Sequence, residues 1–381
     1  MINKLQLENF KIHKSISVDF NYLTLLAGIN SSGKSSIIQS LLLLRQSFVD
    51  GKIQSLKLSG SLCNIGFRED ALCQYADGDD IISIKVNQSQ WRFKFEDSTR
   101  GKNSIPLDLN SPENIDYSNR LFGNGFQYIG ASRLGPQNSY LSDTELVDTY
   151  KQISIRNGQC ENIAYYLYHY GKEQNYIVPE PMRHPNTSSS DLMAQISAWE
   201  GGISAGVRVV SNLEGQDYIL RYSFDTSENS APSVKYAGSR EFLPTNVGFG
   251  LSYSLPIITA LLTAEVGDIV IIENPEAHLH ESGQMVLAQL ICRAANYGIQ
   301  VIVETHSSHI LEGILISTKM FERDDIGISK EKVSLAFFEK DTDTQVSTVI
   351  QPKIVGDGKI DVVPDGFFDQ SSKNLEYIMD F

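Results

Sequence analysis

The chain has few cysteines, and its apolar stretches are short. The four cysteines among 381 residues are widely spaced and form no CxxC pair (Cys63, Cys73, Cys160 and Cys292). This spacing argues against a structural zinc site or a disulfide framework and is typical of a reducing cytosol. The apolar stretch Leu255–Ile272 is interrupted by Glu265 and Asp268, so it falls short of the ~18 consecutive apolar residues of a membrane span. The N-terminus lacks the apolar core of a signal peptide, and we expect a cytoplasmic protein without a membrane partner.

Positive charge is also scarce. The chain has 32 Lys and Arg against 46 Asp and Glu, a net charge of −14, and no run of basic residues. A protein of this charge is repelled on average by DNA and by anionic membranes, so DNA is not a partner that the charge supports. No internal repeat and no sustained heptad pattern is found, which excludes long coiled-coil arms.

The residues that are present indicate a globular α/β chain. The first third predicts two or three strands over residues 2–27, the last of them buried and ending at Gly28, a helix over Ser35–Val49 and an antiparallel hairpin over residues 80–96. The less regular middle predicts helices over residues 161–170 and Asp191–Trp199, and a hairpin over Val207–Phe224. The last third predicts alternating helices and strands over Ser252–Ala264, Asp268–Ile272, Gln284–Ala295 and Gln300–Glu304, with further strands from about Val333. Two continuously apolar strands joined by a helix are typical of a parallel α/β unit.

A phosphate-binding loop follows the third predicted strand. The segment GINSSGKS, residues 28–35, matches GxxxxGK[ST] and lies between a buried strand and a helix, the context that this motif requires. Its backbone N–H groups and the positive end of the helix bind phosphate. Lys34 is predicted to bridge the β- and γ-phosphates, and the Ser35 hydroxyl to bind Mg²⁺. The predicted nucleotide-binding residues of this loop are Gly28, Asn30, Ser31, Ser32, Gly33, Lys34, Ser35 and Ser36.

Two later strands end in polar side chains that complete such a site. The strand before Glu273 predicts a carboxylate for Mg²⁺, and the strand before His306 predicts a histidine that reaches the γ-phosphate or the attacking water. Upstream, the glycine-rich turn Asn246–Ser252 opens a helix and offers a second anion-binding N-terminus. One chain has little use for two such ends around a single nucleotide, whereas a head-to-tail dimer can use both.

The four segments GINSSGKSS, NVGFGLSYSLP, IIENPEAHLH and ETHSSHIL resemble the Walker A, signature, Walker B with D-loop, and switch-histidine segments of ABC-type ATPases. The sequences of these segments are most similar to those of the RecF/SMC/OLD-like group, in a bacterial branch that also carries an ASRLGP segment (131–136) and a GFFDQ segment (366–370). The resemblance implies an ABC-type P-loop NTPase head, a mixed sheet with an antiparallel β lobe and a parallel core, plus an inserted α+β region. The implied division is 1–97 with Walker A, 98–242 as an inserted region for partner contact, 243–325 with the other nucleotide motifs, and 326–381 as C-terminal strands and tail.

This resemblance assigns roles residue by residue. ATP and Mg²⁺ are the implied cofactors, with Ser35 and Glu273 at the metal. Gly248, Gly250 and Ser252 are the signature residues that act across a homodimer or a higher even oligomer, and His306 is the switch histidine. The family setting implies a separate effector, such as a nuclease or toxin in phage defence. Only about 75 residues follow His306, so we expect no nuclease site in this chain.

One residue departs from the ABC pattern. Asn274 stands where a glutamate normally positions the water, and an amide cannot accept the proton of that water. Either Glu276 serves as the general base, or hydrolysis is slow and the protein mainly senses ATP.

Three other groups carry alternative interpretations. His278 and His280 suggest an independent metal site, but their position after Walker B explains them better. Arg133 either approaches phosphate or the partner copy, or binds loop carbonyls. Asp341 and Asp343 suggest a nuclease pair, but a polar turn between two strands is favoured.

Overall fold

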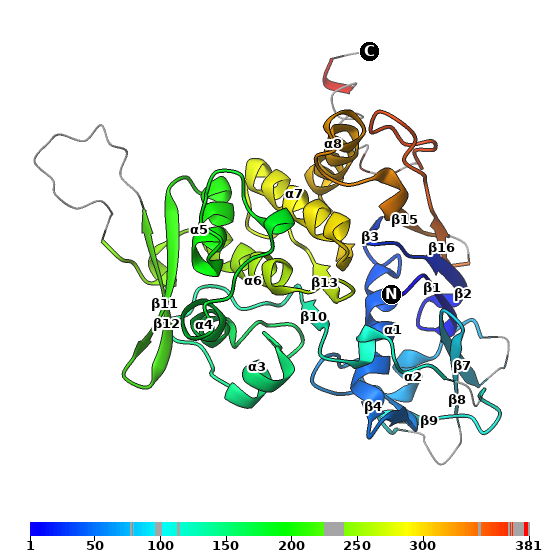
Figure 1. Ribbon diagram of the computed structural model, residues 1–381. Helices are drawn as coiled ribbons and strands as arrows, with labels where there is room; N and C mark the ends of the chain where they lie inside the picture. The colour runs from blue at the N-terminus through cyan, green and yellow to red at the C-terminus, as the bar shows by residue number, and fades with distance from the viewer. Residues whose placement is uncertain are drawn as a thin grey trace, which may run out of the picture. The chain divides into compact units, whose positions relative to one another are not determined.

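The computed structural model describes residues 1–76, 78, 80–95, 101–112, 115–224, 240–341, 344–364, 366, 368 and 377–379. The chain forms two compact units (Figure 1). Unit 1 comprises Met1–Gly123, Ile302–Ser308 and Thr318–Phe381, and unit 2 comprises Asn124–Val301 and His309–Ser317. Among the described helices, none is long and apolar enough to cross a membrane.

Unit 1 contains an antiparallel sheet of four strands in the order β2-β1-β7-β8. Its strands are β1 (Lys4–Phe10), β2 (His13–Asp19), β7 (Ile81–Val86) and β8 (Ser89–Lys94). Alternate side chains of β1 and β2 are buried, among them Leu5, Leu7, Ile16 and Val18. The period of two thus marks a sheet with one buried face, and the predicted hairpin over residues 80–96 is confirmed.

The phosphate-loop strand β3 (Leu23–Gly28) is also in unit 1 and has a strand on each side. It pairs in parallel with β15 (Val333–Lys340), from Leu23 opposite Val333 to Gly28 opposite Phe338. Beyond β15 lies the antiparallel β16 (Ser347–Ile350), and the end of β14 (Gln300–Glu304) neighbours β3 on its other side. Leu23, Leu25, Leu26 and Ala27 are fully buried, as expected of a strand covered on both faces.

Helix α1 (Lys34–Ser47) follows the loop and ends two residues before the predicted end. Phe48 leaves the helix because its ring packs on Tyr117 and Phe122, with centroids 5.1 and 4.9 Å apart. The chain continues into the short pair β4 (Phe48–Val49) and β5 (Lys52–Ile53). The remaining elements of this part of unit 1 are β6 (Ser55–Lys57), α2 (Arg68–Ala71), β9 (Ser104–Pro106) and η2 (Arg120–Phe122).

Unit 2 has its own parallel pair, β10 (Phe126–Ile129) with β13 (Ile269–Glu273), next to the start of β14. Helices α6 (Phe249–Thr263) and α7 (Glu281–Tyr297) pack against each other, and α6 also contacts both strands. Helix α7 ends at Gly298, whose φ of +113° favours glycine, as the sequence predicted. Helix α6 begins three residues earlier than predicted, with Gly248 as its N-cap.

The middle segment supplies the rest of unit 2. It contains α3 (Thr144–Tyr150), α4 (Ile163–Tyr168) with its π-helical continuation η3 (His169–Glu173), η4 (Glu180–Met182), α5 (Leu192–Ile203), β11 (Val207–Glu214), β12 (Asp217–Phe224) and η5 (Pro244–Asn246). Both predicted helices and the predicted hairpin are confirmed. Helix α5 lies against β11 (Figure 1) and packs on α6 and α7.

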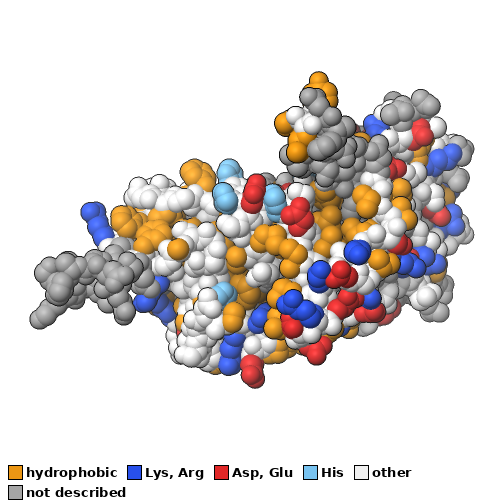
Figure 2. All heavy atoms as spheres, turned by 90° about the horizontal axis from the view of Figure 1, so that it is seen from above, with side chains coloured by type: hydrophobic (Ala, Val, Ile, Leu, Met, Phe, Trp, Pro, Cys, Tyr) orange, Lys and Arg blue, Asp and Glu red, His pale blue; other side chains and the backbone are white. Residues whose placement is uncertain are grey.

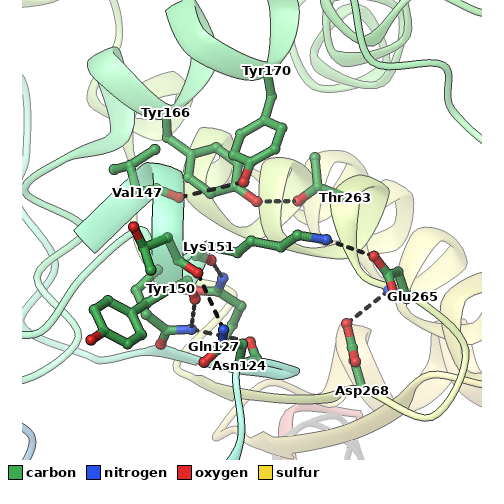
Figure 3. A network of polar contacts seen from close by, with 12 residues as sticks. Asn124, Gln127, Val147, Tyr150, Lys151, Tyr166, Tyr170, Thr263, Glu265 and Asp268 are labelled. Atoms are coloured by element: carbon green, nitrogen blue, oxygen red, sulfur yellow. Dashed lines mark hydrogen bonds and ion pairs between the residues drawn. The ribbon is translucent and has the colours of Figure 1, made fainter. Parts of the chain in front are cut away.

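Polar contacts fasten this middle segment to the α6–β13 turn of unit 2 (Figure 3). The Tyr166 hydroxyl donates to Thr263 Oγ1 at 3.0 Å, and Lys151 pairs with Glu265 at 2.7 Å. The Glu265 amide in turn donates to the Asp268 carboxylate at 2.9 Å. The start of β13 is therefore anchored to α4 and to the residue that follows α3.

At the C-terminal side, one long helix was not predicted, and some of the residues discussed from the sequence lie outside the described ones. Helix α8 (Ser308–Asp324) was not predicted, and η6 (Lys330–Lys332) precedes β15. Asp341 caps the β15–β16 turn, since its Oδ1 accepts from the Thr344 amide at 2.6 Å. This confirms a turn at Asp341, whereas Asp343 and most of residues 366–370 lie outside the described residues.

Candidate functional site

The phosphate loop of unit 1 depends on two glycines. Gly28 and Gly33 have φ values of +138° and +100°, which residues with a Cβ rarely adopt. A Cβ on Gly28 would lie 2.2 Å from the Phe338 carbonyl oxygen, and one on Gly33 would lie 2.5 Å from the His13 ring. The loop is also held from β16, because the Ser347 hydroxyl donates to the Ser32 carbonyl at 2.5 Å. The loop is therefore built into the sheet around it.

Lys34 and Ser35 stand at the start of α1, as predicted. The Lys34 ammonium is buried and donates to the carbonyls of Gly28 at 2.9 Å and Ile29 at 2.8 Å. Burial lowers the pKa of Lys34, and the charge of Glu304 opposes this change. The first turn of α1 has no acidic residue, so no side chain of the helix itself offsets the positive end of its dipole. An ammonium, a hydroxyl and the N-terminus of a helix thus meet where a phosphate chain is expected.

Glu304, at the end of β14, contacts this site and was not assigned a role from the sequence. Its carboxylate is 5% exposed and accepts a hydrogen bond from the Ser35 hydroxyl at 2.8 Å. The two residues are 269 positions apart in the chain. His306 follows two residues later and is exposed.

His13, on β2, packs under the loop and was also missed. Its Nε2 lies 3.0 Å from the Gly33 carbonyl oxygen, so Nε2 carries the proton and donates it. Within the described residues no group hydrogen-bonds the buried Nδ1. Burial lowers the pKa of His13 to about 4, because a second proton would place a charge where no acceptor meets it. The ring is therefore a neutral support for Gly33.

A cavity of about 370 Å³ opens beside the loop in unit 1. Lys11 lines it together with Ser31, Lys34, Ser35 and Gln39, and the Lys11 ammonium donates to Gln39 Oε1 at 2.7 Å. Burial lowers the pKa of Lys11. The cavity therefore presents a second ammonium that the motif alone did not indicate.

In unit 2, Glu273 ends β13 as predicted. Its Oε2 accepts from the Ala131 amide at 3.1 Å, and burial raises its pKa. Asn274 follows with φ +46°, a left-handed conformation in which asparagine is several-fold enriched. The left-handed backbone at position 274 therefore favours Asn over the Glu that the ABC pattern has there. Glu276 lies in the turn that leads to α7.

Arg133 settles one of the open alternatives. Its guanidinium, 2% exposed, donates to the carbonyls of Gly130 at 3.0 Å, Tyr253 at 3.1 Å, Glu273 at 2.8 Å and Asn274 at 2.7 Å. Of the two alternatives for Arg133, the one in which it binds loop carbonyls is observed. Arg133 thereby holds the end of β13 and helix α6 together within unit 2.

The signature turn lies at the N-terminus of α6. Gly248 is exposed, and a Cβ on it would meet nothing within 4 Å, whereas one on Gly250 would lie 2.8 Å from the His278 carbonyl oxygen. Ser252 is buried and faces Tyr140, whose pKa burial raises to about 12. A ligand approaching this turn therefore meets Gly248 and the helix amides, not the Ser252 hydroxyl.

The two histidines after Walker B have structural neighbours. His280 is the N-cap of α7, and the His278 ring packs on Tyr253 with centroids 4.4 Å apart. Among the described residues, no three His, Cys, Asp or Glu side chains are grouped as a metal site.

Comparisons with known proteins agree with this geometry. Residues 1–197 and 208–311 match the model of the AAA ATPase domain family, and residues 328–378 match that of a protein of unknown function (DUF3696). No curated protein matches the chain. The SMC head bound to the C-winged helix domain of ScpA has 12% sequence identity and a TM-score of 0.52, over 93% of this chain and 98% of that chain.

The Smc head domain with an extended coiled coil from Pyrococcus furiosus, bound to the C-terminal domain of ScpA, has 14% identity and a TM-score of 0.47 over 99% of both chains. The match to the first SMC head shows the fold, an ABC-type P-loop ATPase head with a mixed sheet, as the sequence predicted.

Proposed function

The chain belongs to the AAA ATPase domain family, and on that premise we propose that it is an ATP-driven switch. Two copies close around Mg²⁺·ATP, and hydrolysis or release reopens them. Each nucleotide is held by Lys34 of one copy and by the turn at Gly248 of the other. The output passes to a separate effector protein.

The observation that carries this proposal is the prepared anion site at the start of α1. Lys34 lies under the loop, Ser35 presents its hydroxyl, and the first turn of the helix lacks a carboxylate. These groups fit a triphosphate and an oxygen-seeking cation such as Mg²⁺, which takes hydroxyl, carboxylate and phosphate ligands. When bound, the metal would neutralise charge that develops on the phosphates. Asn30, Ser31, Ser32 and Ser36 complete the loop around them.

The other site residues keep the roles that the motifs suggest. Glu273 serves the metal, and His306 contacts the γ-phosphate or the water. Glu276 is the proposed general base, since Asn274 cannot take a proton. Phosphate release by Glu276→Gln tests this assignment, and an unchanged turnover would contradict it.

The phosphate loop is tested by fluorescent ATP binding. Lys34→Ala should weaken binding by roughly 100-fold, because a charge-assisted contact to phosphate contributes about 3 kcal/mol. Lys52→Ala, which removes an exposed lysine from β5 of the same unit, is the matched control and should bind normally. Equal affinity of Lys34→Ala and wild type would refute the site.

The closed pair is tested at Gly248. This residue has an ordinary φ of −60° and open space around its Cα, so Gly248→Asp and Gly248→Ser should both fold. Either side chain suits a helix N-cap. Asp should abolish ATP-dependent dimers by repelling phosphate, whereas Ser should preserve them, as measured by light scattering after gel filtration. ATP-dependent dimers of Gly248→Asp would contradict the paired arrangement.

A non-hydrolysing ATP sensor is the second candidate, and it is supported by Asn274, whose amide cannot take the proton of the attacking water. Tight ATP binding without phosphate release would select it. A head that binds DNA directly is less well supported. The net charge is −14, and Figure 2 shows a face on which Lys and Arg side chains are interspersed with Asp and Glu.

The effector, the trigger and the cytoplasmic location remain parts of the proposal. The inserted segment 98–242 is the proposed partner contact, with a nuclease or toxin as the effector class and phage defence as the setting. Capture of the intact complex from the native host, followed by mass spectrometry, tests this part. Recovery of the chain alone would contradict it.

A further inference from the structure

We propose that Glu304 supplies a metal ligand for the nucleotide site of unit 1, next to the Ser35 hydroxyl. This inference rests on the proposed ATP site and assigns to it a residue from the end of β14. Neither the phosphate-loop motif nor the Walker B strand contains this residue.

The first argument is the position of the carboxylate. Ser35 is the loop residue whose hydroxyl is expected at the metal, and Glu304 is its hydrogen-bond partner at 2.8 Å. The contact lies within unit 1, where β14 is the neighbour of the phosphate-loop strand β3. The Glu304 carboxylate stands at the end of β14, and the Ser35 hydroxyl follows the loop at the end of β3. The two oxygens therefore lie at the same edge of the sheet.

The second argument is the distance between the two oxygens. Magnesium binds oxygen at about 2.0–2.1 Å in an octahedron, so two adjacent ligands lie about 2.9 Å apart. The Ser35 Oγ to Glu304 Oε1 distance of 2.8 Å matches this spacing. The hydroxyl and the carboxylate oxygen therefore already lie at the separation of two adjacent ligands, and the hydroxyl only has to turn its proton away from the carboxylate.

The third argument is charge. Glu304 is 5% exposed, and its carboxylate contacts the hydroxyl of Ser35, the residue after the loop lysine. A carboxylate so close to the phosphate loop repels a bare triphosphate, whereas a bound divalent cation turns the same charge into an attraction. Glu304 should therefore oppose ATP binding without metal and favour it with metal.

The test measures fluorescent ATP affinity in EDTA and in Mg²⁺ for wild type, Glu304→Gln and Glu304→Asp. In Glu304→Gln, affinity in EDTA should equal or exceed that of wild type, and the gain in affinity on adding Mg²⁺ should fall by about tenfold or more. Glu304→Asp keeps the charge and should restore part of that gain. Glu8→Gln, an exposed carboxylate on β1, is the matched control and should keep the whole gain.

A second readout follows the metal itself. Binding of Mn²⁺ in the presence of ATP, measured by electron paramagnetic resonance, should weaken in Glu304→Gln, and melting curves check that the variant is folded. A full Mg²⁺ gain in Glu304→Gln would overturn the proposal. Loss of phosphate release with an intact Mg²⁺ gain would also overturn it and assign Glu304 as the general base.

The outcome is distinguishable from failure of the ATP site. If the proposed function were wrong, wild type itself would bind no nucleotide in either buffer. Lys34→Ala should lose binding both in EDTA and in Mg²⁺, whereas Glu304→Gln should lose only the part that depends on metal.

Discussion

Acidification should destabilise unit 1 through His13. The folded chain holds this ring neutral, with a pKa of about 4 against the ordinary 6.5. Between these values the unfolded chain binds a proton that the folded chain does not, so stability falls as the pH decreases. The loss amounts to about 2 kcal/mol at pH 5 and about 3 kcal/mol below pH 4. Above pH 7 the contribution is complete.

The assay uses the two tryptophans, of which Trp91 lies in unit 1 and Trp199 in unit 2. In a Trp199→Phe background, fluorescence during urea denaturation reports unit 1 through the buried Trp91. His13→Gln keeps an N–H donor but cannot titrate. Wild type should lose about 2 kcal/mol more than His13→Gln between pH 7.5 and pH 5.

His306→Gln removes an exposed histidine of the same unit and serves as the control, which should follow wild type. If His13→Gln and wild type lost the same stability over this range, the neutral ring beneath Gly33 would be refuted. Measurements at several salt concentrations separate this local effect from the general charge of −14.

Three further predictions concern unit 2. The lysine of Arg133→Lys cannot reach the four carbonyls that the guanidinium binds, so this variant should lose roughly 3 kcal/mol of stability, at about 1 kcal/mol for each lost hydrogen bond. Thermal unfolding followed by Trp199 fluorescence measures the loss. Asn274→Glu should cost about 1 kcal/mol because its φ is +46°, whereas Asn274→Gly should stay near wild type; equal melting of both variants would contradict the strain. Burial raises the pKa of Glu200 well above its ordinary value, so the folded chain keeps a proton that the unfolded chain loses, and wild type should lose stability as the pH rises toward that raised pKa. Urea denaturation at pH 5 and pH 8 should show this loss in wild type and its absence in Glu200→Gln.

The phosphate loop could be predicted from sequence because its determinants are local. A buried strand, two glycines with positive φ and the start of a helix follow one another within a few residues, and the structure places β3 and α1 accordingly. The hairpins and helix α7 were found for the same reason, whereas the equally long helix α8 was missed. The prediction that Gly28 ends a strand needed no knowledge of the rest of the chain.

Glu304 and His13 could not be assigned in this way. Their roles arise from pairing between distant segments, since Ser35 meets Glu304 across 269 positions and Gly33 meets His13 across 20. A glutamate at a strand end and a histidine on a strand are common, and only the contact with the loop distinguishes them.

The signature turn shows a different cause of error. The helix begins at Phe249, three residues before the predicted start, and Ser252, which the resemblance assigned to the signature, is buried. Helix starts without a polar side-chain cap are hard to locate, because glycine suits both a loop and an N-cap. The nucleotide role of Ser252 stays a prediction.

Strand β15 has a consequence for how the protein can be divided. It belongs to the segment 328–378, which has no assigned role, yet it covers one side of the strand that leads into the phosphate loop. A polypeptide ending at residue 311, where the ATPase match stops, would leave β3 as a bare apolar edge open to aggregation, and would remove the Ser347 support of Ser32. Strands β15 and β16 are thus part of the sheet that carries the phosphate loop, and the boundary between the two family matches does not coincide with a boundary in the fold.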